Sequence, residues 1–228
     1  LFRRTSSAAA NPTTQGISLR AIAPSGAGRT LVLLDGVPLN DPFGGWVIWS
    51  QATPESLESL DVIRGAGSGP YGAGALTGTI TLRERGKGGA LDVSASERGG
   101  LRAAASASTR LGPLAVTLIG LREVSDGYVP VRGPAAGAAD TPLDLDSRSA
   151  ALRVDTALGQ ANLSVRAATW EEDRGSGLAG TRANASGHSL SATAAQTPSA
   201  DGYGWRLQAW RIDSNLANSS ASVSADRS

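Results

Sequence analysis

Apolar and polar side chains alternate along the chain from residue 90 onward. Six segments have a period of two, and a seventh is apolar on both faces: 91–96, 101–110, 150–158, 161–167, 189–194 and 205–209, then 114–122. A period of two is typical of a β-strand with one apolar and one polar face. The polar faces carry serines and five arginines, Arg102, Arg110, Arg153, Arg166 and Arg206. The pattern predicts about seven strands of roughly ten residues, the length that a tilted strand needs to cross a bilayer.

The joins between these segments give a second signal. From the second join onward they alternate between short and long: 97–100, 111–113, 123–146, 159–160, 171–187 and 198–204. Membrane barrels show this alternation because their periplasmic turns are tight and their external loops are long. A soluble β-sandwich also alternates apolar and polar residues, but nothing sorts its loops in this way. The joins therefore favour antiparallel strands of a transmembrane β-barrel.

The stretch Arg29–Arg83 has a different pattern. An apolar run at 30–34 and a second at 37–39 flank Asp35-Gly36, the dipeptide typical of a tight hairpin, in which both turn residues have φ > 0. Thr53-Pro54-Glu55 offers a helix start and predicts a short helix over Pro54–Leu60. Further strands are expected at 17–20, 60–64 and 79–83. The stretch predicts a small mixed α/β unit.

Glycine marks the turns and the boundary of this unit. Gly65 and Gly72 lie in a glycine-rich crossing over 65–78, where tight turns require residues without a Cβ. A basic, glycine-rich stretch at 85–89 separates the two patterns. We therefore divide the chain into domains 1–87 and 88–228.

Composition excludes several classes of protein. The net charge is +1, which gives no footprint for a nucleic acid, and the absence of Cys excludes disulfides and thiolate metal sites. No run of about 18 apolar residues is present, so any contact with a membrane must be made by strands. Because the chain contains no Met, even at position 1, we expect it to be an internal fragment of a longer protein.

Three sequence segments carry a family resemblance: LVLLDGVPLNDPFGG, ESLDVIRGAGSGPYGAGALTGTITL and, upstream, ISLRA. In this order and spacing they resemble the plug domain of TonB-dependent outer-membrane receptors, over about residues 11–87. Two positions depart from the family pattern: Ala21 follows the arginine where glycine is usual, and Pro70 precedes Tyr71-Gly72 where an apolar residue is usual.

The resemblance implies a fold and a function. The fold would be mainly β, a small plug followed by the first strands of a bacterial outer-membrane barrel. The function would be energised import of a scarce nutrient, such as a metal chelate or cobalamin. TonB would act through an N-terminal motif that precedes Leu1. Two alternatives remain open at this point: a non-energised porin-like channel, and a soluble secreted β-rich binding or adhesion module.

Two sets of site residues follow from the resemblance. Arg20 and Arg64 would pair with barrel glutamates on later strands and hold the plug in place; the alternative is two solvated arginines. A ligand-facing apex would comprise Arg29, Asn40, Asp41, Phe43 and Trp46. For Phe43 and Trp46, packing inside the plug is an equal alternative, and for Trp49 internal packing is favoured.

Other chemistry is weakly supported. Residues 67–72 match G-x-G-x-x-G, but Pro70 and the following strand pattern leave no helix to receive a dinucleotide. His188 is the only histidine, which disfavours a metal site, and Glu171-Glu172-Asp173 fits a solvated strand end better than a Ca²⁺ site. No catalytic constellation is present, so we predict a transporter without cofactor or enzymatic activity.

Overall fold

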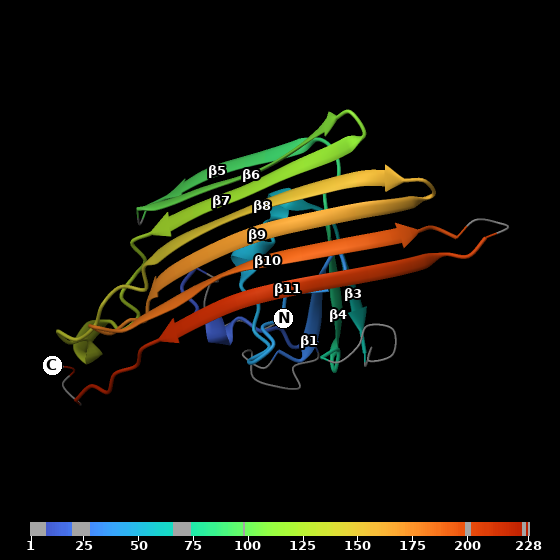
Figure 1. Cartoon of the computed structure of the whole chain (residues 1–228). Coiled ribbons are helices and arrows are strands. Elements are labelled where there is room, and N and C mark those ends of the chain that lie inside the picture. Colours follow the sequence, from blue (N-terminus) through green and yellow to red (C-terminus); the bar gives the residue numbers. More distant parts are fainter. Residues whose placement is uncertain are drawn as a thin grey trace.

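The computed structural model describes residues 8–19, 28–65, 74–97, 99–198, 202–224 and 227. The described strands form a four-stranded sheet and a seven-stranded sheet (Figure 1). The small sheet ends with β4 at Glu84, and the large sheet begins with β5 at Gly89.

The small sheet has the order β2-β1-β4-β3. Its strands are β1 (Thr30–Leu34), β2 (Val37–Pro38), β3 (Leu57–Arg64) and β4 (Gly78–Glu84). β1 is parallel to β4, while β2 and β3 run antiparallel to their neighbours. Every residue of β1 is buried, and its side chains form a core with β4 and the intervening segment, in which Val32 and Val47 are fully buried.

The hairpin between β1 and β2 confirms the prediction from Asp35-Gly36. Asp35 has φ 49° and Gly36 has φ 88°, so both turn residues are left-handed. A Cβ on Gly36 would also lie 2.5 Å from a guanidinium nitrogen of Arg206 on the large sheet. Gly65 likewise has a positive φ of 113°, whereas Gly72 lies outside the described residues.

The predicted helix over Pro54–Leu60 is wrong. Only a 3₁₀ turn forms, η4 (Pro54–Ser56), and β3 begins at Leu57 because residues 57–64 pair along β4. Three other 3₁₀ turns are defined in the described chain: η1 (Pro12–Thr14), η3 (Trp49–Gln51) and η5 (Gly133–Ala135). Within the described ranges, no helix combines the length and the apolar character needed to cross a membrane.

The predicted strand at 17–20 is also wrong over its described part. Ile17–Leu19 makes no strand ladder; instead, the Ile17 carbonyl accepts from Thr30 N at 3.1 Å. Leu19 N donates to the hydroxyls of Thr30 and Thr77 at 3.1 and 3.2 Å. These hydroxyls replace the ladder bonds that the apolar pattern suggested.

The large sheet is a meander in which each strand pairs antiparallel with the next. Its strands are β5 (Gly89–Ser96), β6 (Gly100–Leu111), β7 (Leu114–Ser125), β8 (Leu145–Leu158), β9 (Ala161–Gly175), β10 (Arg182–Gln196) and β11 (Trp205–Asn218). In the described chain β5 and β11 are its two edges, and the sheet is not closed. The prediction of a mainly β fold with seven antiparallel strands is confirmed.

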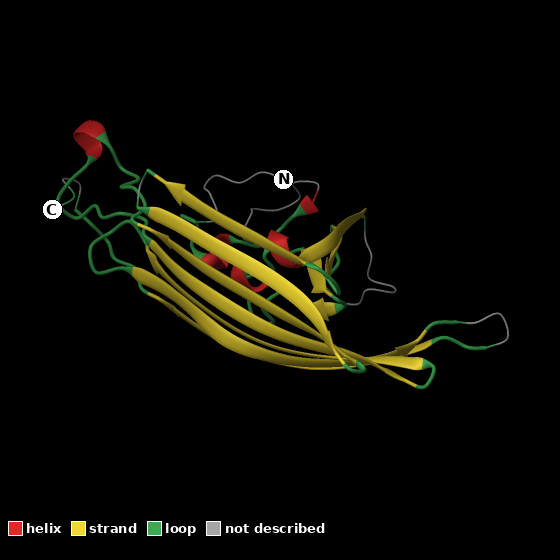
Figure 2. Cartoon of the chain, turned by 90° about the horizontal axis from the view of Figure 1, so that it is seen from above, coloured by secondary structure: helices red, strands yellow, loops and turns green. Residues whose placement is uncertain are grey.

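The two faces of the large sheet differ as the alternation predicted. Large apolar side chains are exposed on the convex face, among them Leu91, Val93, Leu118, Leu152, Leu190 and Leu207. The small sheet and the 3₁₀ turns η3 and η4 lie against the concave face (Figure 2), where Arg102, Arg153, Arg166 and Gln208 contact the plug side. The sheet is therefore apolar outside and polar inside.

The strand joins differ from the prediction at one place. Joins 97–99, 126–144 and 176–181 lie at one end of the large sheet, which we call the loop end. Joins 112–113, 159–160 and 197–204 lie at the other, the turn end. The predicted long join 171–187 is wrong because β9 and β10 continue through it, and 176–181 is shorter than 197–204. The polar residues that suggested a loop are paired instead, as Glu171 is with Arg148 and Asp173 with Arg182.

Candidate functional site

Glu84 is the centre of a charge cluster between the two sheets. It ends β4, and its side chain has 0% exposure. Arg166 of β9 donates from Nε to both carboxylate oxygens at 3.0 and 3.1 Å and approaches through a second nitrogen at 2.9 Å. Arg153 of β8 lies 3.7 Å away. A buried carboxylate is tolerated where guanidinium groups surround it in this way.

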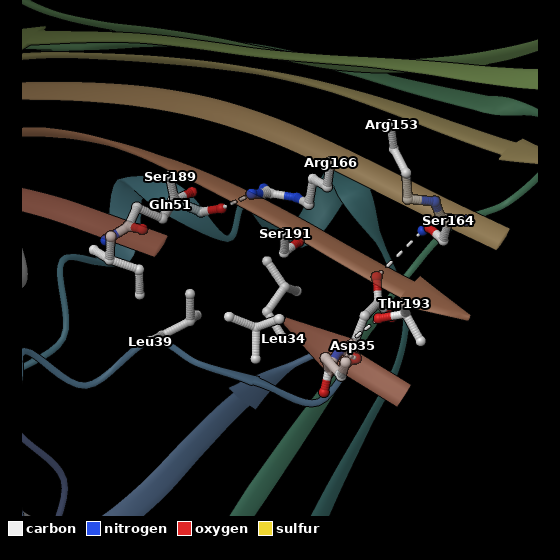
Figure 3. Close-up of a pocket in the computed structure, with 13 residues that line it drawn as sticks. Leu34, Asp35, Leu39, Gln51, Arg153, Ser164, Arg166, Ser189, Ser191 and Thr193 are labelled. Carbon is white, nitrogen blue, oxygen red and sulfur yellow. Dashed lines mark hydrogen bonds and ion pairs between the residues drawn. The ribbon is translucent and has the colours of Figure 1, made fainter. Parts of the chain in front are cut away.

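Asp35 extends the cluster toward the turn end (Figure 3). Its Oδ2 accepts from Arg153 at 3.3 Å, and its Oδ1 accepts from Glu84 N at 3.2 Å. Its carbonyl accepts from Arg206 at 2.6 Å and from Gln208 at 3.1 Å. Burial, with the negative charge of Glu84, raises the pKa of Asp35 above its ordinary value, and Arg153 offsets only part of this. The residues lining this part of the interface leave a cavity of only about 30 Å³.

A second ion pair joins the sheets at the loop end. Arg102 of β6 donates to both oxygens of Glu55 at 2.9 and 2.8 Å, and also to Asp92 at 2.8 Å. The Ser106 hydroxyl donates to the Glu55 carbonyl at 2.7 Å. The hydrogen bonds from Arg102 lower the pKa of Glu55. Glu55, which was expected to favour the start of a helix, thus anchors the N-terminal unit to the large sheet.

The polarity of the described pairs is the reverse of the predicted lock. The N-terminal unit supplies the carboxylates and the large sheet supplies the guanidiniums. Arg20 lies outside the described residues, and Arg64 is exposed on β3 with no carboxylate of the described chain at ion-pair distance. The lock role of Arg20 and Arg64 stays a prediction.

Sequence reasoning missed the carboxylates, although a signal was present. Arg102, Arg153, Arg166 and Arg206 all occupy the polar faces of alternating strands. A guanidinium on an inward face requires an acceptor, and the acids of the N-terminal unit were the available ones.

Asn40 and Asp41 shape the loop that was predicted to face a ligand. The Asn40 side chain accepts from Val32 N at 2.7 Å and donates to the carbonyls of Thr30 and Gly45 at 3.1 and 3.0 Å. Asp41 Oδ1 accepts from the next turn, from Phe43 N and Gly44 N, both at 2.9 Å. These side chains hold the loop from within.

The aromatic residues of this loop divide between packing and exposure. Trp46 packs against Trp170, Ile48 and their neighbours near the loop end of the large sheet. Phe43 is 95% exposed, and its ring meets Trp46 edge to face with centroids 6.5 Å apart. Arg29 is also exposed. Trp49 packs against the core of the small sheet, as predicted, and donates to the Gln15 carbonyl at 3.1 Å.

The N-terminal unit matches a known family of domains. Residues 3–79 match the family model described as the TonB-dependent receptor plug domain. This segment belongs to that plug family. We therefore call the described residues 8–84 the plug. A search of curated proteins by sequence finds no match.

Solved structures share the fold of the plug together with the large sheet. The siderophore receptor PirA from Pseudomonas aeruginosa matches with a TM-score of 0.65 at 19% identity, over 91% of this chain and 37% of that one. The ferric yersiniabactin uptake receptor FyuA from Yersinia pestis matches with a TM-score of 0.66 at 17% identity, over 83% and 32%. The copper transporter OprC matches with a TM-score of 0.60 at 17% identity, over 82% and 30%. The chain spans about a third of the length of these proteins.

The charged side chains between the two sheets pair mainly with one another. No group of three or more His, Cys, Asp or Glu within the described ranges is placed to hold a metal. His188 lies 3.2 Å from Asp213. The described charges of the interface are used to seat the plug against the sheet.

Proposed function

We propose that the chain is part of an energy-coupled receptor of the bacterial outer membrane. Residues 1–87 would be its plug domain, and residues 88–228 the first strands of its barrel. The observation that carries the proposal is the seating of a plug by Glu84, Asp35 and Glu55 on the polar concave face of a sheet whose convex face exposes leucines. A soluble module would have no reason to expose such a face to water, and an open porin would lack the plug.

The ends of the sheet suggest an orientation. External loops of membrane barrels are longer than periplasmic turns, and the longest join, 126–144, lies at the loop end. The loop end would face outward, and the Phe43 loop, which packs near it, would meet the arriving ligand. TonB would act on the plug from the periplasm through a segment preceding Leu1. Arg29, Asn40, Asp41, Phe43 and Trp46 remain the proposed ligand-facing set.

The imported nutrient is proposed to be a scarce metal chelate or cobalamin. PirA and FyuA are described as a siderophore receptor and a ferric yersiniabactin receptor, and OprC as a copper transporter. These similar proteins support the class of cargo without selecting one compound.

The test is uptake by a strain lacking the gene for the full-length receptor. Labelled ferric siderophores, copper and cobalamin are supplied singly, with and without a protonophore. We expect one cargo to depend on the gene and to stop entering when the protonophore is added. Gene-dependent entry that continues with the protonophore present would exclude energy coupling, and entry that never depends on the gene would exclude import of these cargoes.

A further inference from the structure

A second space lies between the plug and the large sheet, near the loop end. Its volume is about 630 Å³, compared with about 30 Å³ beside Asp35 and Arg166. One wall is the plug segment 49–55, and the other is formed by the loop-end halves of β5–β9. Cavities of about 300–1,000 Å³ are the size that holds small-molecule ligands. The interface is therefore nearly filled beside Asp35 and Arg166 and open beside the loop-end halves of β5–β9.

The charged side chains lining this cavity are mostly acidic. The described lining has four carboxylates and two guanidiniums: Glu55, Asp92, Glu123 and Glu172, with Arg102 and Arg174. Arg102 is shared between Glu55 and Asp92, and Arg174 pairs with Glu172 at 2.9 Å. Glu123 has no cation of the described chain at ion-pair distance. A recess lined by an excess of one sign concentrates solutes of the opposite sign.

Hydroxyl groups in the same lining give an independent indication. The side-chain oxygens of Ser50, Thr53 and Ser147 are buried and make no hydrogen bond within the described chain. All three residues line the cavity, and their exposed fractions are 7%, 3% and 2%. Ser50 and Thr53 lie on the plug wall and Ser147 on the sheet wall. A buried hydroxyl without a partner is destabilising, so three of them around one cavity are unusual unless a guest can hydrogen-bond to them.

We propose that this cavity is a transit site for a positively charged solute that carries hydrogen-bonding groups, on its way between plug and barrel. The inference rests on the proposed import function and adds to it a route and a class of cargo. The route passes the plug on the side of β5–β9, where the interface is open, and avoids the closed cluster around Glu84. The acidic lining selects cationic complexes against anionic ones such as ferric tris-catecholates.

The experiment places a cysteine in the cavity of the full-length receptor, in cells. Ser94 lines the cavity and is exposed, and this part of the receptor contains no natural cysteine. Ser94→Cys is labelled with thiosulfonate reagents of similar size that carry either a trimethylammonium or a sulfonate group. Ala136→Cys, in the exposed join 126–144, gives the intrinsic reactivity ratio of the two reagents.

We expect the normalised ratio to favour the cationic reagent by at least about tenfold at Ser94→Cys. Adding Glu123→Gln should reduce this preference several-fold. Modification at Ser94→Cys should stop uptake of the labelled cargo while leaving its binding to the cell surface, and modification at Ala136→Cys should leave both.

Two results would overturn the transit site: a normalised ratio near one, or uptake that continues at the parental rate through the modified Ser94→Cys receptor. Either would leave the proposed import function intact if parental uptake still stops with a protonophore. Parental uptake that ignores the protonophore would instead remove the energy-coupled function itself.

Discussion

Replacing Glu84 by Gln tests whether the buried charge cluster holds the plug in place. The substitution keeps the shape of the side chain but removes the charge that Arg166 and Arg153 face. Removing one partner of a buried ion pair costs about 3–5 kcal/mol, because the remaining charge is left uncompensated. Arg153 keeps Asp35 and Asp155 as partners, which places the expected loss at the lower end. We therefore expect about 3 kcal/mol, or about a hundredfold in the docking equilibrium.

Hydrogen exchange of the full-length receptor in lipid vesicles measures this loss. The amides of β1 and β4 exchange when the plug opens, so their rates report the free energy of that opening. Glu58→Gln is the matched control, because Glu58 is an exposed residue of β3 in the same small sheet. The amides of β1 and β4 should exchange about a hundredfold faster in Glu84→Gln and at the parental rate in Glu58→Gln.

A second substitution separates loss of the pair from general damage. If the cost comes from an uncompensated guanidinium, adding Arg166→Met to Glu84→Gln should recover part of the stability. Exchange rates in Glu84→Gln that match those of Glu58→Gln would refute the reasoning. Strictly additive effects of the two substitutions would refute the coupling between Glu84 and Arg166.

Three further predictions concern the turn, the apex loop and the convex face. Because burial raises the pKa of Asp35, this residue stabilises the docked plug at low pH, and the stabilisation is lost as the pH rises through the raised pKa. Asp35→Asn should therefore flatten this part of the pH profile of plug opening. An unchanged profile would contradict this prediction. Asn40→Ala leaves Val32 N without its acceptor and should destabilise the plug by about 1–3 kcal/mol, seen as a lower denaturant midpoint; an unchanged midpoint would show that the loop is held otherwise. Leu152→Arg places a charge near the middle of the convex face and should cost about 2–4 kcal/mol of barrel stability in vesicles. Leu158→Arg, at the end of the same strand, should cost only about 0–1 kcal/mol. Equal losses of stability in the two variants would contradict a membrane-facing surface.

The large sheet was predictable from the sequence because its signals are local. A period of two needs only neighbouring residues, and it correctly assigned the outward leucines and the inward arginines. The extension of β9 through Glu171–Gly175 was missed because that part of the strand is charged. Its charges are satisfied by residues of adjacent strands, such as Arg148, which a local pattern does not show.

The interface was less predictable because its partners lie far apart in the chain. Glu84 meets Arg166 and Asp35 meets Arg153 across more than eighty residues, and no local pattern joins them. Pro54–Ser56 illustrates the same limit on a smaller scale. Thr53 makes no capping hydrogen bond, and only a 3₁₀ turn forms because the following residues pair with β4.

The plug carries the acidic residues of the interface and the large sheet carries the arginines. This arrangement would affect how a displaced plug returns to its place. An uncharged, apolar contact would attract the plug only at van der Waals distance, whereas opposite charges attract each other across several ångströms of water. Once pulled aside, the hairpin tip with Asp35 and the end of β4 with Glu84 would be drawn toward Arg153, Arg166 and Arg206. In the proposed receptor, the arginines of the large sheet would guide the plug back, and its return would slow as ionic strength increases.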